Sequence, residues 1–335
     1  MLLKSLTIYL SIVSLFILLP LRTEASVAKR TAIITRIFGK VKILINPNIN
    51  VVGPGPHALV NGKYYTVLKG RVGLKIPDQT LIQTEKAARV RIIYPNGDQF
   101  SVGSNTSYTI KTHQSSKKEQ TIIQMLFGSL RATVEKGGPR KKLKLRTRTM
   151  AMGVRGTDFF VASESKNGGS SITVLRGKVA IRNKNDKEGK EVILPKGFSA
   201  KIGKSQKAAS NTSQGAIVLS KTTKEKILSI HERSQVKKGS KDISSLDNKT
   251  KSLLLSLENR AIAVVMKDIK EDDPQLYKKI KKYGKAPTSL EDLQTATLKN
   301  AFEKAPKSKN LLKPKPKDLE LSDEEVYEKY FKSEE

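Results

Sequence analysis

The sequence contains no cysteine and no tryptophan, and only three histidines. Without cysteine the chain has no disulfide framework, no thiol nucleophile and no thiolate metal site, so its fold must depend on a hydrophobic core. The histidines, His57, His113 and His231, are not at metal-ligand spacing, so we predict no metal site and interpret all three as surface residues. Aromatic residues make up 5% of the chain, and this scarcity disfavours nucleic acid as a partner because few side chains could stack on bases.

Catalytic motifs are also missing. Ser163 and Lys166 have the spacing of a serine acylase motif, but the partner motifs of that class are absent. Residues 53–58 formally fit a dinucleotide fingerprint, yet two prolines fill it and no amphipathic helix follows to hold a pyrophosphate. No pair of carboxylates stands out from the surface acids. We therefore predict a noncatalytic protein that uses no cofactor.

The N-terminus reads as an export signal. Lys4 precedes an uncharged apolar run from Leu6 to Leu21, and small residues follow. We predict a signal peptide over residues 1–25, with cleavage after Ala25, and a periplasmic mature protein with no integral membrane span. The alternative is that the segment stays uncleaved and anchors the protein in the inner membrane.

Acidic residues are scarce in the first 204 positions, which hold 11 against 36 basic residues, whereas the whole chain has a formal net charge of +32. Such an excess of positive charge favours an anionic neighbour, namely an acidic polymer or a lipid surface. Lysines that only solvate the surface would produce the same count. Both interpretations stay open at this stage.

Residues 31–203 show short alternating apolar runs separated by turn residues, as in an all-β domain. We predict hairpins at 89–102, where Asn96-Gly97 provides a tight turn, at 172–182 around Gly177, and at 191–202 around Gly197. The fold class we expect is an all-β main domain, sandwich-like or an irregular β-roll, with a mainly α-helical C-terminal region.

The rest of the chain divides by composition. We predict a linker over 204–220, a helical region over 221–303, a Lys/Pro-rich linker over 304–318 and a short helix over 319–335. Ser244 with Asp247 and Thr288 with Glu291 have the spacing of a capping box, and Asp273 followed by proline is typical of a helix start.

A basic stripe precedes the most informative motif of the chain. In a strand, Lys142, Lys144, Arg146 and Arg148 share one face, while Leu143 and Leu145 point the other way. The stripe could be an anion-binding surface. It could equally be an edge strand that is charged to prevent aggregation between sheets.

The next apolar run is interrupted by Arg155, Gly156 and Thr157. The run Val154, Arg155, Gly156, Thr157, Asp158, Phe159 resembles the signature of the FecR-domain family, and Gly177 and Val179 resemble its downstream strand start. Further elements follow in the family's order, so that the resemblance extends from Ile34 to Ile202. We interpret these as structural residues: Val154 and Phe159 as core anchors, Gly156 as a bend, Thr157 as a partner for a freed backbone group, and Arg155 as paired with a nearby acid.

The resemblance implies an extracytoplasmic β-domain that serves in binding or signal transfer. Our leading hypothesis is a noncatalytic periplasmic FecR-domain protein that binds a cell-envelope component, either an anionic polymer such as peptidoglycan or a protein partner. The alternative is a membrane-anchored component of envelope signalling related to sigma-factor regulation. Because few residues precede the apolar run, we expect no cytoplasmic regulatory segment.

Overall fold

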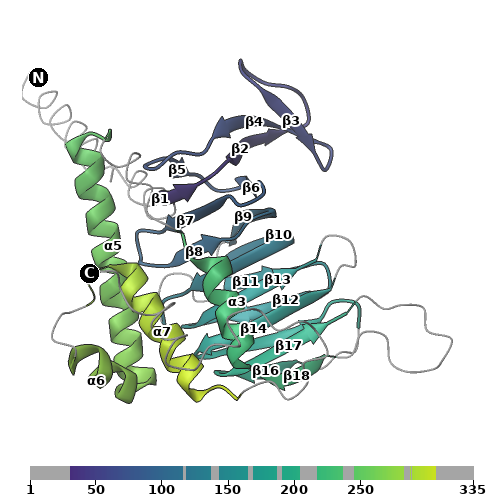
Figure 1. Ribbon diagram of the computed structural model, residues 1–335. Helices are drawn as coiled ribbons and strands as arrows, with labels where there is room; N and C mark the ends of the chain where they lie inside the picture. The colour runs from purple at the N-terminus through teal and green to yellow at the C-terminus, as the bar shows by residue number, and fades with distance from the viewer. Residues whose placement is uncertain are drawn as a thin grey trace, which may run out of the picture.

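The computed structural model describes residues 31–115, 118–136, 143–164, 169–186, 191–203, 217–236, 245–282, 287 and 289–306. In these residues an N-terminal part of 18 β-strands is followed by four α-helices, which confirms the predicted fold class (Figure 1). The predicted signal peptide 1–25 and C-terminal helix 319–335 lie outside the described residues, as do most of the linkers 204–220 and 304–318.

Hydrogen bonding joins the strands into two sheets that share β10. Sheet A is antiparallel throughout, with the order β5 (Lys75–Ile76), β1 (Ala32–Phe38), β7 (Arg89–Ile93), β8 (Gln99–Val102), β10 (Lys118–Thr133), β13 (Asp158–Ser163), β14 (Ser170–Arg176), β17 (Phe198–Ile202) and β18 (Val218–Lys221). Sheet B has the order β3 (His57–Val60), β4 (Lys63–Lys69), β2 (Val41–Asn48), β6 (Leu81–Thr84), β9 (Thr106–Ser115), β10, β11 (Leu143–Arg146), β12 (Met150–Val154), β15 (Lys178–Asn183) and β16 (Val192–Pro195). Only the β10–β11 pair of sheet B is parallel.

Strand β10 connects the two sheets. Its first part pairs with β9 and β11 in sheet B, and from Gly128 onward it pairs with β8 and β13 in sheet A. The two sheets therefore form one roll and cannot separate without breaking this strand.

The core lies between the sheets and follows the alternation of each strand. On sheet A the inward residues lie in register across neighbouring strands: Val90, Val102, Leu130, Val161 and Ile172. The facing register row on sheet B is Ile110, Ile123, Leu145, Met152 and Ile181. All of these side chains belong to one buried cluster.

Only one of the three predicted hairpins forms. β7 and β8 pair directly across the turn at Gly97, as expected. The other two predictions are wrong in topology although their strands exist: β14 belongs to sheet A and β15 to sheet B, and likewise β16 belongs to sheet B and β17 to sheet A. The turns at Gly177 and Gly197 therefore carry the chain from one sheet to the other. A glycine turn reverses the chain direction both in a hairpin and in such a crossing, so the turn sequence does not distinguish them.

The helices are α3 (Lys224–Ser234), α5 (Asn248–Asp272), α6 (Pro274–Lys282) and α7 (Leu290–Lys304). α5 begins at the N-cap Asp247, three residues later than the sequence pattern predicts. α7 begins at a capping box formed by Ser289 and Asp292, one residue later than predicted. Asp273 precedes Pro274 at the start of α6, as expected.

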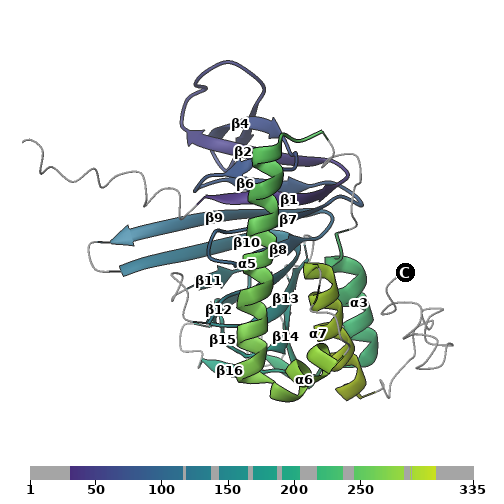
Figure 2. The same ribbon diagram turned by 90° about the vertical axis from the view of Figure 1, so that its left-hand side faces the viewer.

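The long helix α5 closes the roll along one side. Figure 2 shows it running from the level of β2 and β4 to that of β16. Leu254, Leu257 and Ala261 join the core between the sheets, and Val264 lies against the turn at Gly97. The helix thus packs on the turns of the roll.

Helices α3 and α7 cover the outer face of sheet A. Phe160 of β13 forms a second buried cluster with Ile227 and Ile230 of α3 and with Leu298 and Phe302 of α7. Within the described part of the chain, no helix combines the length and apolar character that crossing a membrane requires.

Candidate binding surfaces

The motif that interrupts the apolar run is the crossing from sheet B to sheet A. β12 ends at Val154 in sheet B and β13 starts at Asp158 in sheet A. Gly156 has φ of +62°, and a Cβ atom there would lie 2.6 Å from the Cβ of Lys136. A Cβ at Gly177 would likewise lie 2.6 Å from the Gly156 carbonyl oxygen, so the two crossings pack directly against each other. This contact leaves no space for side chains at either position.

The side chains around this crossing differ in their roles. Val154 and Phe159 lie in the core, and Val154 pairs with Val179 of β15. The buried hydroxyl of Thr157 makes no hydrogen bond within the described residues, so the expected bond to a freed backbone group is not seen there, and the Thr157 backbone carbonyl accepts from the Val134 amide at 2.9 Å. Arg155 is exposed, and no described carboxylate pairs with it.

Asp158 is the acid that forms the ion pair of the motif. Both of its oxygens accept hydrogen bonds from Arg131 of β10, at 3.0 Å from Nε and 2.8 Å from a terminal nitrogen. Both side chains are almost fully buried. The bidentate pair holds β13 against β10 on the outer face of sheet A, where a charge needs such a partner.

Sheet A buries three further arginines on the same face, and the helices supply their partners. Arg36 of β1 and Arg91 of β7 both pair with Glu291 of α7, and Arg36 lies 3.5 Å from Glu258 of α5. Arg176 of β14 lies 3.3 Å from both Asp268 and Asp272 of α5. All four arginines, including Arg131, are at most 5% exposed. Burial lowers the pKa of Arg91 while Glu291 acts to raise it.

A histidine interpreted as a surface residue lies under this cover. His231 of α3 is 5% exposed, which corrects the prediction from the sequence. Burial and the nearby Arg131 lower its pKa to about 4. With this lowered pKa the imidazole is neutral near pH 7. It lines a small cavity together with Arg131 and Glu291.

The outer face of sheet B carries cations that none of the helices in the described residues covers (Figure 1). Lys144 and Arg146 of β11 are exposed while Leu143 and Leu145 are buried, as the sequence pattern predicts. Lys178 and Arg182 are exposed on the same side by the alternation of β15, and Arg155 is exposed in the bend directly after β12. We call these five residues, Lys144, Arg146, Arg155, Lys178 and Arg182, the basic face. β11, β12, β15 and β16 contain no aspartate or glutamate.

The surface between these cations is flat. Register places Arg146 opposite Ala151 and Ala151 opposite Arg182, while Lys144 is opposite Gly153 and Gly153 opposite Ala180. Arg146 and Arg182 are two strands apart, about 10 Å, and Lys144 and Arg146 are about 7 Å apart along one strand. A polymer with regularly spaced anions can therefore contact several of them at once.

Two members of the predicted stripe differ from the basic face. Lys142 lies outside the described residues, and Arg148 is exposed in the bend between β11 and β12. The interpretation of β11 as an edge strand is wrong, because β10 and β12 pair with it on its two sides. Protection of a sheet edge therefore does not explain its charges.

Residues 80–180 match the family model described as FecR protein. The match begins just before β6 and ends within β15, so it includes the crossing at Gly156, the Arg131–Asp158 pair and most of the basic face. This confirms the family resemblance for that segment, while the resemblance expected from the sequence extends further on both sides.

Two solved structures resemble the chain, both described as a "putative anti-sigma factor" from Parabacteroides distasonis. Their TM-scores are 0.34 and 0.33, at 18% and 17% sequence identity. Each alignment covers 42% of this chain, and the chain spans 59% of the length of each of those structures. No curated protein matches the chain. Among the described residues, no group of three or more histidine, aspartate or glutamate side chains is arranged to hold a metal ion.

Proposed function

We propose that the chain is a noncatalytic FecR-domain component of envelope signalling, which recognises an anionic partner through the basic face. The observation that carries the proposal is the position of the FecR match: residues 80–180 include β11, β12 and the start of β15, where that face lies. The family resemblance implies binding or signal transfer outside the inner membrane.

The chemistry of the basic face defines the partner. Its cations lie on a paired, central part of a sheet, so a ligand would meet a rigid surface with a fixed spacing of charges. The positions between these cations hold small residues, namely Ala151, Gly153 and Ala180, so the side chains of the cations project above them. An extended chain of phosphates or carboxylates, from an envelope polymer or an acidic protein segment, complements such a surface.

The cellular location is part of the proposal. We propose that the β-roll works in the periplasm, with the N-terminal segment either removed or kept as an inner-membrane anchor. N-terminal sequencing of the protein from its own cells separates these forms, since a mature start at Ser26 would exclude the anchored one.

Co-sedimentation with purified peptidoglycan tests recognition. We expect the protein to pellet with the polymer and a triple variant, Lys144→Gln, Arg146→Gln and Arg182→Gln, to lose most of this binding. The matched control carries Lys63→Gln, Lys75→Gln and Lys86→Gln, which remove the same charge from exposed positions elsewhere. If both triple variants lost binding equally, or if high salt abolished it in every protein, net charge alone would explain the result.

Signalling requires a second readout in cells. We expect deletion of the gene to change transcription of a small set of genes under envelope stress, and the intact chain to restore it. Restoration by the control triple variant but not by the basic-face triple variant would link recognition to the signal. Unchanged transcription under all envelope stresses would contradict the signalling role.

A second function is favoured by the charge pattern alone. Binding of the anionic polymer could be the whole activity, with no signal passed on. Normal co-sedimentation together with unchanged transcription would support this function over the first.

A further inference from the structure

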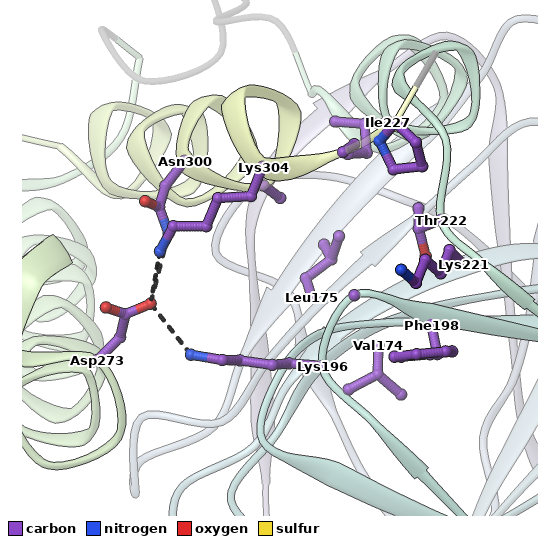
Figure 3. Close-up of a pocket in the computed structure, with 14 residues that line it drawn as sticks. Val174, Leu175, Lys196, Phe198, Lys221, Thr222, Ile227, Asp273, Asn300 and Lys304 are labelled. Atoms are coloured by element: carbon purple, nitrogen blue, oxygen red, sulfur yellow. Dashed lines mark hydrogen bonds and ion pairs between the residues drawn. The ribbon is translucent and has the colours of Figure 1, made fainter. Parts of the chain in front are cut away.

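A cavity of about 460 Å³ lies where the last strands of sheet A meet the helices, and most of its lining residues follow the FecR match in the sequence (Figure 3). One wall is apolar and is formed by Val174 of β14, Phe198 of β17 and Ile227 of α3. The volume lies within the range of about 300–1,000 Å³ that is typical of small-molecule sites. The cavity is therefore large enough for a small organic ligand.

The rest of the cavity is basic, with Lys196 and Lys304 on one side beside Asp273, and Lys221 on the other side near Phe198 and Thr222 (Figure 3). Lys196, Lys221 and Lys304 all line the cavity, and Asp273 is the one carboxylate among the residues that do so. The Asp273 Oδ2 atom lies 3.3 Å from the Lys196 ammonium and 3.5 Å from the Lys304 ammonium. In Figure 3 both lysines point toward that carboxylate. Three cations and one anion leave two positive charges for a ligand.

The carboxylate is held in its charged form. Burial acts to raise the pKa of Asp273, but the hydrogen bond from the Leu276 backbone amide, together with Lys196 and Lys304, lowers it. Asn300 also donates to Asp273, at 3.4 Å. Asp273 therefore positions Lys196 and Lys304, while Lys221 forms no ion pair within the described part of the chain.

We propose that this cavity binds a small soluble phosphate monoester with an apolar group. The apolar group would lie against Val174, Phe198 and Ile227, and the phosphate would lie in the space between Lys221 on one side and Lys196 with Lys304 on the other (Figure 3). A phosphate monoester carries nearly two negative charges near pH 7, which matches the two uncompensated cations. Because the walls come from the roll, from α3 and α7, and from Asp273 between α5 and α6, the bound ligand would link the helices to sheet A.

This site is independent of the proposed function, and its test avoids the basic face. The chain has no tryptophan, so Phe198→Trp places a single fluorescent reporter in the cavity of the full-length protein. We expect monomeric octyl phosphate to shift its emission saturably. Tyr64→Trp, in the distant β3–β4 hairpin, provides the control reporter and should not respond.

Charge reversal then tests the lysines of the cavity. In the Phe198→Trp protein, Lys221→Glu should weaken octyl phosphate binding by about tenfold or more, whereas Lys63→Glu should leave it unchanged. Lys221 is exposed at the end of β18, so its replacement should leave the fold intact, which circular dichroism would check.

Four results would overturn the proposal: no saturable shift, equal binding by octanol, equal binding by inorganic phosphate, or equal affinity of the two charge variants. A shift with vesicles that contain phosphatidic acid but not with monomeric octyl phosphate would also overturn it, because the site would then belong to a lipid surface. Loss of peptidoglycan binding in the basic-face variant would leave this result untouched.

Discussion

The outer faces of both sheets carry cations on neighbouring strands, but the two faces differ in the groups that lie opposite these cations. On sheet A, Arg36, Arg91 and Arg176 are buried and each meets a carboxylate from α5 or α7. On sheet B, Lys144 and Arg146 face outward, and none of the four described helices lies above them (Figure 1). The same residue types therefore fix the helices on one side and leave positive charge for a partner on the other.

The comparison also explains the uneven distribution of charge along the chain. The 20 acidic residues that follow position 204 include Glu258, Asp268 and Glu291, which neutralise arginines of the β-region. Carboxylates of the helical region thus neutralise the buried arginines of sheet A. Part of the remaining positive charge of the β-region lies on the basic face.

Removal of the shared carboxylate of sheet A should have the largest effect. Glu291→Ala leaves Arg91 buried without its charged partner and also removes a partner of Arg36. We expect the free energy of unfolding to fall by about 3–5 kcal/mol, measured by urea denaturation. Glu232→Ala, an exposed acid on α3, is the control and should change it by less than about 0.5 kcal/mol. Equal effects of the two changes would refute the role of Glu291.

The buried histidine should make the cover of sheet A sensitive to acid. The pKa of His231 in the folded state, about 4, is below the ordinary value of 6.5, so the unfolded chain binds the proton first as pH falls. The contribution is present above pH 6.5 and is lost as pH falls toward 4, by at most about 3 kcal/mol.

His231→Gln should remove this part of the pH dependence. Urea denaturation at several pH values between 4 and 7 would measure it, and parallel curves for the two proteins would contradict a buried neutral imidazole. His57→Gln is the control, since His57 belongs to the outlying β3–β4 hairpin.

The crossing between the sheets should be the next most sensitive position. Gly156→Ala has to place a Cβ at positive φ and 2.6 Å from the Lys136 Cβ, whereas Gly197→Ala, also at positive φ, meets nothing within 4 Å. We expect Gly156→Ala to lower the free energy of unfolding, measured by denaturant titration, by about 2 kcal/mol more than Gly197→Ala does. Both variants force alanine into the left-handed region, but only the Cβ at position 156 also clashes with a neighbouring side chain. Equal losses of stability in the two variants would contradict this prediction, because they would mean that the backbone at the crossing shifts to fit the added Cβ.

The smallest change in stability belongs to the basic face. Lys144→Gln with Arg146→Gln should shift the free energy of unfolding by no more than about 0.5 kcal/mol, since both side chains are exposed. A loss as large as that of Glu291→Ala would mean that these cations are structural, and the contrast between the sheets would then fail.

The sequence predicts the strands better than their partners. Alternation alone places Leu143 and Leu145 inside and Lys144 and Arg146 outside, and Asn96-Gly97 marks a hairpin that forms. Gly177 has equally good turn chemistry but lies at a crossing between sheets. Local preferences do not distinguish the two cases, because the choice depends on which distant strand is free to pair.

The buried arginines are the main omission. Each interrupts an apolar run, as Arg91 does between Val90 and Ile92, and this is a signal that the sequence contains. Their partners could not be predicted, because Glu291 is 200 residues away from Arg91 and resembles any acid in the first turn of a helix. The central position of β11 in its sheet could not be predicted either. Its parallel partner β10 is separated from it in the sequence, and the residues of β11 alone do not indicate this pairing.

The Arg91–Glu291 pair also has a consequence for the time course of synthesis. Arg91 leaves the ribosome 200 residues before its counter-ion, and at about 5–20 residues per second the interval is roughly 10–40 s. During that interval sheet A can begin to pair, but its outer face holds charges that have no cover. Until the last helix of the described chain has been made, water therefore has to solvate the arginines of this face, and they become buried only when the helices pack on it.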